Sequence, residues 1–227
     1  MIKLEHTDVY GFEAAIRGMR NPFNSWDKSD SGYVDCENYE GVACKSECPY
    51  GHFCIESPYW HYNIGENDLA LMRKLAHAGD DHGKFARFIN VTVDVTAPLY
   101  WWKEFDTYKV GTVSNSCSTM HKIHEKEFSV DDFSHEHLGK NPTVFLLETI
   151  RALNVARREF LETKDKKYWW YLIQLLPSSY NQRRTVQLNY QVLNRIYHAR
   201  KNHKLDEWHE FCAWVEKLPY FKQIYLD

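Results

Sequence analysis

Apolar side chains recur at intervals of three and four residues in several stretches of this chain, a spacing that places them on one face of an α-helix. Residues 89–96 differ, because they form a β-branched run that is typical of a strand. The predicted helices are residues 8–20, 66–79, 98–110, 141–163, 168–176, 183–201 and 205–218. The pattern therefore predicts a largely helical chain with a strand near its middle. Residues 122–140, which are rich in charge, are expected to form a solvated connector.

The predicted helix over residues 183–201 carries an unusual set of polar positions. Asn189 and Arg200 are spaced so that they share one face with Leu193 and Ile196. Eleven residues of helix return to within about 20° of the starting direction. An amide and a guanidinium on a buried face must each find a polar partner. We expect that partner to be either a carboxylate of the core or an anionic ligand.

The segment over residues 94–124 changes character halfway along. Its first half is aromatic and its second half is rich in short hydroxyl and amide side chains. The members are Tyr100, Trp101, Trp102, Phe105 and Tyr108, followed by Thr112, Ser114, Asn115, Ser116, Ser118 and Thr119. Rings beside short hydrogen-bonding groups suit a pocket for a planar polar ligand. The alternative is a packed helix followed by a Ser/Thr-rich loop.

Composition narrows the class of protein. With 227 residues, 44% hydrophobic and 15% aromatic, the chain is expected to form a single well-cored domain over residues 1–227. A net charge of −3 gives no general attraction to nucleic acid. No apolar run is long enough to cross a membrane, and the start of the chain lacks a signal peptide. We therefore expect a cytoplasmic protein with no membrane or nucleic-acid partner.

Residues 24–65 show weak periodicity and hold a cluster of cysteines. Cys36, Cys44, Cys48 and Cys54 fall within twenty residues, so their thiolates could bind zinc tetrahedrally and organise the segment. The spacing lacks the paired Cys-x2-Cys of ordinary zinc ribbons. An iron–sulfur cluster is a weaker interpretation. The alternative is a set of reduced free thiols on an insertion.

The C-terminal half resembles the flavin-dependent thymidylate synthases. The match rests on Leu176-Pro177, Asn189, Arg200 and Glu207-Trp208. The spacings up to Arg200 agree with the family, and the last is shifted by one residue. Earlier matching positions are Asp81-His82 with Phe85, and Asn115 with Ser118 in the family's Ser/Asn-rich signature. The resemblance covers roughly residues 66–215.

The same signature also shows departures from the family. Tyr108-Lys109-Val110 stands where the family has Arg-His-Arg. Ser116 stands in place of a glutamate, and Met120-His121 in place of the final Arg-Tyr. Losing several cations from one site removes charge-assisted hydrogen bonds worth about 1.5–3 kcal/mol each. The departures bear on activity more than on fold.

The resemblance implies an α+β fold with a central sheet flanked by long helices, here with a Cys-rich insertion near the N-terminus. It also implies a homotetramer that uses FAD, methylenetetrahydrofolate and NADPH to methylate C5 of dUMP. The implied catalytic residues are Arg200, at the uracil ring, and Ser118, at the nucleotide phosphate. The implied cofactor-binding residues are Asn189, His82, Asn115, Gln191 and Arg195. Lys109, His121 and Arg184 are the expected replacement cations for the substrate, beside Ser118 and Arg200.

Three interpretations of function remain open from the sequence. The first is an enzyme similar to the flavin-dependent thymidylate synthases. The second is a catalytically altered or non-catalytic nucleotide-binding protein on the same fold, which the missing arginines favour. The third is a metal-organised interaction protein centred on the cysteine cluster. Flavin absorbance, stabilisation by nucleotide, and sensitivity to chelator would separate these three.

Overall fold

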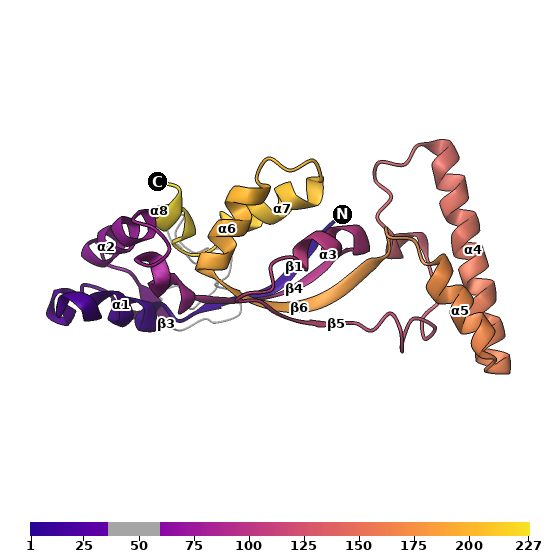
Figure 1. Cartoon of the computed structure of the whole chain (residues 1–227), viewed down its shortest axis with the longest axis horizontal. Coiled ribbons are helices and arrows are strands. Elements are labelled where there is room, and N and C mark those ends of the chain that lie inside the picture. The colour runs from indigo at the N-terminus through magenta and orange to yellow at the C-terminus, as the bar shows by residue number, and fades with distance from the viewer. Residues whose placement is uncertain (36–59) are drawn as a thin grey trace. The chain divides into compact units, whose positions relative to one another are not determined.

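Six strands, eight α-helices and four short 3-10 helices make up the part of the chain that the computed structural model describes, residues 1–35 and 60–227 (Figure 1). The strands are β1 Lys3–Tyr10, β2 Gly32–Asp35, β3 Trp60–Asn63, β4 Asn90–Pro98, β5 Val113–Ser116 and β6 Asn181–Asn189. The α-helices are α1 Phe12–Arg20, α2 Glu66–His77, α3 Leu99–Phe105, α4 Lys140–Thr163, α5 Lys166–Leu175, α6 Tyr190–Arg200, α7 Asp206–Val215 and α8 Phe221–Tyr225. The 3-10 helices are η1 Asn21–Phe23, η2 Trp26–Lys28, η3 Gly83–Arg87 and η4 Val130–Asp132. No helix among these residues is both long and apolar enough to cross a membrane.

The strands form two sheets. The larger sheet has four strands in the order β1-β4-β6-β5, and the smaller pairs β2 with β3 in antiparallel register, Tyr33 opposite Tyr62. Side chains of β4 alternate, with Val91, Val93 and Val95 buried and the residues between them partly exposed. Alternation with period two is what one buried sheet face requires. The strand predicted over residues 89–96 is therefore confirmed.

The chain divides into two compact units, which are described separately. Unit 1 comprises residues 1–3, 94–107 and 114–185, and unit 2 comprises residues 4–93, 108–113 and 186–227. The segments of the two units alternate along the chain. Neither unit therefore corresponds to one continuous stretch of sequence.

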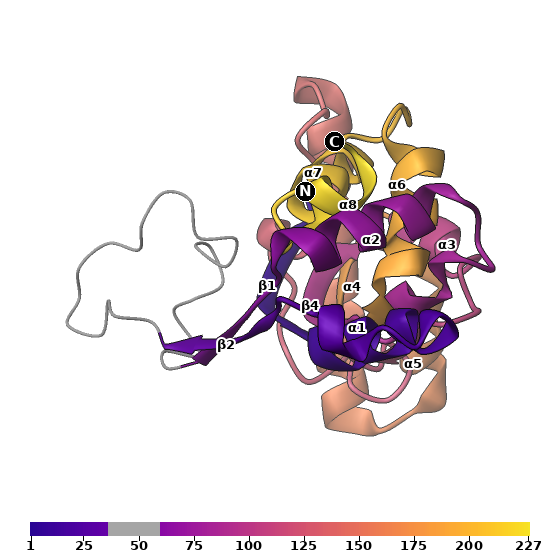
Figure 2. The ribbon, with the colours of Figure 1, turned by 90° about the vertical axis from the view of Figure 1, so that its left-hand side faces the viewer.

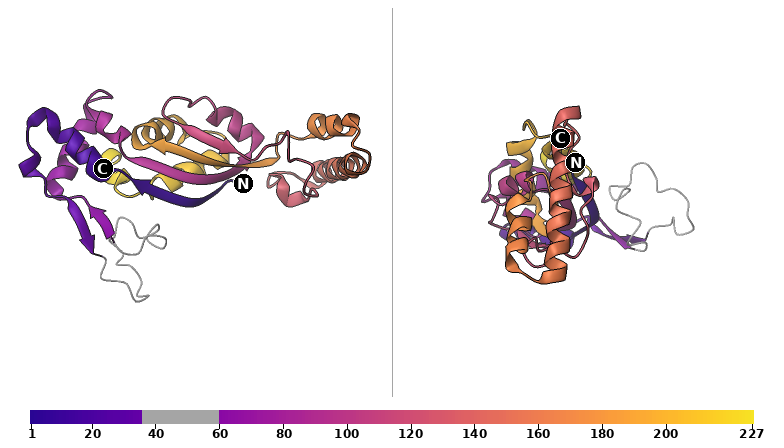
Figure 3. Two further views of the ribbon diagram at one scale, coloured as in Figure 1. Left: turned by 90° about the horizontal axis from the view of Figure 1, so that it is seen from below. Right: turned by 90° about the vertical axis from the view of Figure 1, so that its right-hand side faces the viewer.

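Unit 1 contains the long antiparallel pair α4 and α5, which lie side by side (Figure 3). Its core includes Leu146, Ile150 and Leu153 of α4, which lie in the helix predicted over residues 141–163. The expectation of a solvated connector over residues 122–140 is wrong in part. Ile123 and Phe133 of that segment are buried in the same core. These apolar side chains stand among many charged residues, so the segment shows no hydrophobic periodicity. A segment without periodicity can still bury single apolar side chains in a core.

Three of the four aromatic residues of α3 are core side chains of unit 1. Trp101, Trp102 and Phe105 are at most 3% exposed. Their ring centroids lie 4.9–5.3 Å apart in edge-to-face and stacked contacts. The indole nitrogen of Trp102 donates a hydrogen bond to the Gln182 carbonyl at 2.9 Å. For these three rings the packed-helix interpretation is confirmed and the pocket interpretation is wrong.

Unit 2 has a second, separate aromatic core. Phe12 of α1 meets Tyr190 and Tyr220 edge to face, with ring centroids 5.8 and 5.7 Å apart. Tyr190 in turn meets Phe221 at 5.5 Å. Helix α2 packs along α8 (Figure 2). This aromatic packing holds α6 and α8 against α1, and α8 in turn contacts α2.

A buried ion pair fixes the start of α2. The Asp68 carboxylate is fully buried and accepts hydrogen bonds from Arg20 Nε at 2.5 Å and from the Ser29 and Ser31 hydroxyls at 2.6 Å each. Asp30 accepts from the backbone N–H groups of Asn67 and Asp68, at 2.9 and 3.1 Å, at the positive end of the helix. Burial raises the pKa of Asp68, but the hydrogen bonds from the two serines and Arg20 outweigh it and lower that pKa below its ordinary value. Asp68 therefore joins three separate segments of unit 2.

The helix predicted over residues 183–201 is wrong for its first half. Residues 181–189 form β6, in which Gln182, Val186 and Leu188 are buried, and the helix begins only at Tyr190. Strands β1 and β5 and helix α8 were also not predicted. Pairing with β4 favours an extended chain here, although glutamine and arginine are good helix formers.

The proposed cysteine ligands Cys36, Cys44, Cys48 and Cys54 lie outside the described residues. Within the described ranges, no group of three or more His, Cys, Asp or Glu side chains could hold a metal ion. The two described cysteines, Cys117 and Cys212, are free thiols. Nothing in the described structure supports a Cys-rich insertion, and zinc stays a prediction from the sequence.

Candidate functional site

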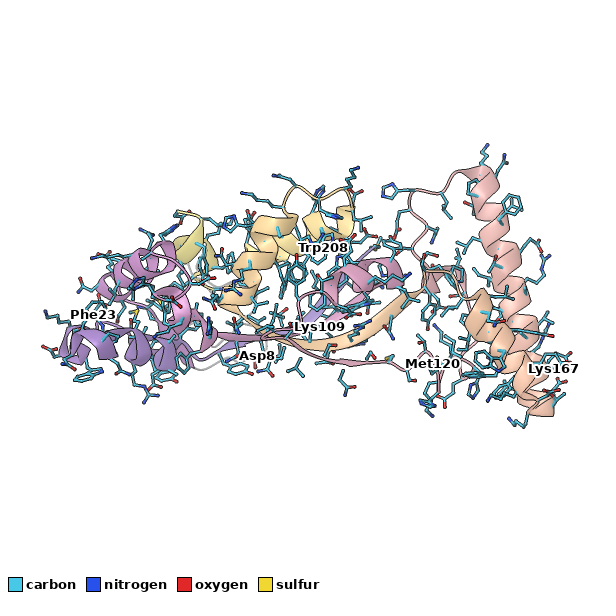
Figure 4. The ribbon with its side chains drawn as sticks, viewed as in Figure 1. Asp8, Phe23, Lys109, Met120, Lys167 and Trp208 are labelled. Atoms are coloured by element: carbon cyan, nitrogen blue, oxygen red, sulfur yellow. The ribbon has the colours of Figure 1, made fainter. Side chains whose placement is uncertain are left out.

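Arg200, at the last turn of α6, lies against two aromatic rings in unit 2. Its Nε donates a hydrogen bond to the Tyr108 hydroxyl at 2.8 Å. The central carbon of its guanidinium is 5.5 Å from the Tyr108 ring centroid and 4.9 Å from that of Trp208. Trp208 comes from α7, is labelled in Figure 4, and is fully buried. Guanidinium groups are attracted to ring faces at such distances, so the cation is held in a defined place.

The turn over residues 108–112 presents Tyr108 to Arg200. The Thr112 hydroxyl donates to the Tyr108 carbonyl, and Gly111 adopts a left-handed conformation with φ +78°. A Cβ atom on Gly111 would lie 3.0 Å from Val192 Cγ2 and 3.2 Å from Asn189 Nδ2. Glycine is therefore required both by the conformation and by the close approach to α6. The same turn carries the exposed Lys109, labelled in Figure 4.

Asn189 caps the N-terminus of α6. Its side-chain oxygen accepts a hydrogen bond from the Val192 N–H at 3.1 Å, which is the usual role of an N-cap asparagine. The prediction that Asn189 and Arg200 share one buried helix face is wrong, because Asn189 precedes the helix. Eleven residues of helix rise about 16 Å. The two side chains therefore belong to opposite ends of α6.

A cavity of about 600 Å³ opens between α1, α2 and η3 in unit 2. It is lined by Gly18, Met19, Pro22, Phe23, Leu75, Asp81, His82, Lys84, Phe85, Arg87 and Phe88. Met19, Leu75 and Phe85 are buried and make an apolar floor. Phe23, labelled in Figure 4, and Phe88 are more than half exposed. This size is typical of a pocket for a drug-sized or cofactor-sized ligand.

The cations Lys84 and Arg87 line this cavity together with His82 and the carboxylate of Asp81. Arg87 Nε donates to Gln191 Oε1 at 2.5 Å, its one hydrogen bond within the described chain. The side chains of His82 and Lys84 make no hydrogen bond or ion pair with any described residue. An apolar floor flanked by exposed rings and cations suits an aromatic ligand that carries an anionic group.

Gln191 connects this cavity to α6. It is buried and receives Arg87 on its oxygen, while its nitrogen donates to the Asp80 carbonyl at 3.0 Å. Arg195 forms an ion pair with the Asp80 carboxylate. The structure thus brings three predicted cofactor residues, His82, Gln191 and Arg195, into one region of unit 2.

Arg184 was predicted as a replacement cation and is already bound within unit 1. Its two terminal nitrogens donate to the Asp106 carboxylate at 2.7 and 3.4 Å, and its Nε donates to Gln182 at 3.0 Å. The guanidinium also lies 4.1 Å from the Trp102 ring centroid. The prediction paired the Arg184 guanidinium with a substrate anion. In the structure its partner is the Asp106 carboxylate.

The remaining predicted residues also lie in unit 1. Ser118 Oγ accepts hydrogen bonds from the backbone N–H groups of Met120 and His121, at 3.3 and 2.9 Å, in a tight turn. Asn115 on β5 and His121 are exposed. These three residues occupy a short segment from β5 into the turn. That segment offers a hydroxyl, an amide and an imidazole.

Sequence reasoning missed most lining residues of the cavity, among them the exposed rings and cations Phe23, Lys84, Arg87 and Phe88. The signal was the sequence Lys84-Phe85-Ala86-Arg87-Phe88, in which one ring is 2% exposed and the other 52%. A short 3-10 helix places side chains three residues apart on the same edge, so Lys84 and Arg87 fall together.

Comparisons with known proteins give a match in fold. No family profile matches the sequence, and no curated protein matches it either. Two solved structures of the flavin-dependent thymidylate synthase ThyX from Helicobacter pylori, with FAD and dUMP, match at TM-score 0.66 with 16% and 14% identity. Each match covers 100% of this chain and 98% of the other.

A further solved structure extends this likeness. The UMP/dUMP methylase PolB from Streptomyces cacaoi, bound with 5-Br dUMP, matches at TM-score 0.57 with 13% identity. The match covers 99% of this chain and 94% of PolB. At these identities the likeness establishes the fold. The part of the chain that the structure describes has the fold of the flavin-dependent thymidylate synthases, which confirms the α+β fold predicted from the sequence resemblance.

Proposed function

We propose that this protein is a flavin-dependent enzyme that transfers a one-carbon unit to C5 of a pyrimidine deoxynucleotide, dUMP. The observation that carries the proposal is the guanidinium of Arg200, held by the Tyr108 hydroxyl and the Trp208 ring. It supports the role of base-binding residue that the sequence resemblance gives to Arg200. The solved proteins with this fold that bind dUMP or its bromo analogue support the choice of substrate.

The proposed phosphate-binding residues are Lys109, Ser118 and His121. Lys109 directly follows Tyr108 on the same turn and is exposed, so its ammonium is a cation beside the cluster of Arg200, Tyr108 and Trp208. Ser118 and His121 are kept from the sequence resemblance as phosphate contacts. Arg184 is left out of the assignment, because Asp106 and Gln182 occupy its donors.

The cavity between α1, α2 and η3 fits the requirements of FAD. Its apolar floor and the exposed rings of Phe23 and Phe88 suit a flat ring system, and Lys84 and Arg87 suit the pyrophosphate. His82, Gln191 and Arg195 of the same region are the proposed flavin-side residues. Asn189 and Asn115 are kept as flavin-side residues from the sequence resemblance. Bound flavin would supply the redox chemistry, with methylenetetrahydrofolate as carbon donor and NADPH as reductant.

The purified protein is expected to be yellow, with the absorbance bands of an oxidised flavin. Arg87→Ala is expected to weaken FAD affinity about tenfold, because it removes a cation from the lining of the cavity. The visible absorbance spectrum reports the bound flavin, and FAD titration followed by flavin fluorescence measures the affinity. Arg158→Ala, an exposed arginine on α4, is the matched control and should leave affinity unchanged. A wild-type protein that carries no flavin absorbance after incubation with FAD and removal of the unbound FAD would contradict a flavin-dependent reaction.

A non-catalytic nucleotide-binding protein is the second candidate. The observation that favours it is the loss of cations, with Tyr108-Lys109-Val110 replacing Arg-His-Arg and Arg184 bound to Asp106. Such a protein would gain thermal stability from dUMP in the absence of flavin, as binding to the folded state requires. It would release no reduced or methylated product.

We also propose that the protein is a homotetramer in which α4 and α5 contact a second copy. Apolar residues are exposed along this pair, among them Phe145, Trp170, Tyr171 and Leu175, with Phe145 at 73%. A patch of this kind marks an association surface. Phe145→Glu is expected to reduce the assembly to smaller species, as measured by light scattering. Val113→Glu on β5 is the control, and an unchanged mass for Phe145→Glu would contradict this surface.

A further inference from the structure

The hydroxyl of Tyr108 acts on Arg200 at one particular atom. It accepts the hydrogen bond of Nε, at 2.8 Å, which is the nitrogen that joins the guanidinium to its aliphatic stem. A bond at this atom fixes rotation about the end of the stem and so fixes the plane of the whole fork. An arginine side chain that lacks such a contact samples many rotamers, so this bond reduces the number of orientations open to the guanidinium.

Tyr108 is itself rigidly held. The Thr112 hydroxyl donates to its carbonyl, and the left-handed Gly111 seats the turn against Val192 and Asn189. The Tyr108 ring also meets the buried Trp208 ring edge to face, with centroids 6.3 Å apart. A partner that is already ordered loses little entropy when it holds a second group, which is the condition for preorganisation.

We propose that Tyr108 is a positioning residue, which orients the guanidinium of Arg200 for the pyrimidine base. This inference rests on the proposed function, because it assigns the base to Arg200. Tyr108 touches Arg200 through its hydroxyl and its ring. The two contributions are separable, because phenylalanine keeps the ring and removes the hydroxyl alone.

The experiment compares two tyrosine-to-phenylalanine variants of the full chain. Tyr108→Phe removes the hydroxyl that binds Arg200. Tyr197→Phe removes a hydroxyl from α6, the helix that carries Arg200. That hydroxyl donates a hydrogen bond to Glu216 at 2.8 Å. Isothermal titration with dUMP should give a dissociation constant about tenfold weaker for Tyr108→Phe, since a hydrogen bond to a charged group is lost. Tyr197→Phe should bind as the wild type does.

A second measurement needs no nucleotide. In an amide-type ¹H–¹⁵N spectrum, the Nε–H signal of Arg200, assigned by its loss in Arg200→Lys, should shift or broaden in Tyr108→Phe. The Nε–H signal of Arg157, which donates to the His124 carbonyl at 2.9 Å, serves as the internal control and should stay in place. A positioning role requires that both the affinity and this signal change.

The outcomes separate this inference from the proposed function. If the wild type binds dUMP and Tyr108→Phe binds it equally well, the positioning role is overturned and the proposed function stands. The role is also overturned if Tyr197→Phe weakens binding as much, or if the Arg200 signal does not move. If the wild type binds no pyrimidine nucleotide, the proposed function fails and this inference falls with it.

Discussion

Replacing Arg200 with alanine is expected to weaken dUMP binding by at least about 100-fold. The guanidinium is half-buried and held by Tyr108 and Trp208, so its donors reach a ligand with little loss of freedom. Two hydrogen bonds from a charged donor contribute about 1.5–3 kcal/mol each, which amounts to two or more powers of ten in affinity. Isothermal titration of wild type and variant measures the change.

Folding must be followed in the same variant. Loss of the cation from the Tyr108 and Trp208 rings is expected to cost about 1 kcal/mol of stability, which leaves the chain folded. Arg158→Ala removes an exposed arginine of α4 and should change neither stability nor affinity. An Arg200→Ala protein that binds every pyrimidine nucleotide as the wild type does would disprove the assignment of this site.

Replacing Asp68 with alanine is expected to lower the free energy of unfolding by about 3–5 kcal/mol. The change removes the buried acceptor of Arg20, Ser29 and Ser31, and it leaves the Arg20 guanidinium buried without its carboxylate. Urea denaturation followed by tryptophan fluorescence measures the loss. Glu148→Ala, which breaks the exposed ion pair with Arg151, should cost less than about 1 kcal/mol. Equal losses in the two variants would contradict a special role for the buried pair.

The same carboxylate gives the protein a dependence on acid. The pKa of Asp68 is lowered in the folded state, so folding favours the ionised form. The resulting stabilisation is complete above the unfolded-state pKa of about 3.9 and is lost as pH falls through the lower folded-state pKa. Asp68→Asn should therefore show a weaker fall in stability than the wild type over that acidic range.

Local signals accounted for the elements that the sequence predicted well. The β-branched run predicted β4. In the sequence, Pro98 directly precedes α3, the acidic Glu66 and Asp68 stand in the first turn of α2, and Gly79 follows the end of α2. In each case the information lies within a few residues of the element. Those predictions needed no knowledge of distant partners.

Strand β6 and the Arg200 cluster depended on distant residues. Residues 181–189 carry good helix formers, and their extended form follows from pairing with β4, some ninety residues earlier. Tyr108 and Arg200 are 92 positions apart, so no local spacing connects them. The sequence showed that Arg200 needed a polar partner, and the resemblance suggested that Arg200 binds the base. Neither indicated that the Tyr108 hydroxyl is its partner.

The alternation of the two units along the chain bears on the order of events on the ribosome. Residues 94–185 emerge before residues 186–227, so most of unit 1 is complete while unit 2 still lacks α6, α7 and α8. Phe12 then has neither Tyr190 nor Tyr220 to pack against. During synthesis the apolar surface around Phe12 therefore stays exposed until the last helices are made. Nascent chains stalled before residue 190 are expected to recruit chaperones.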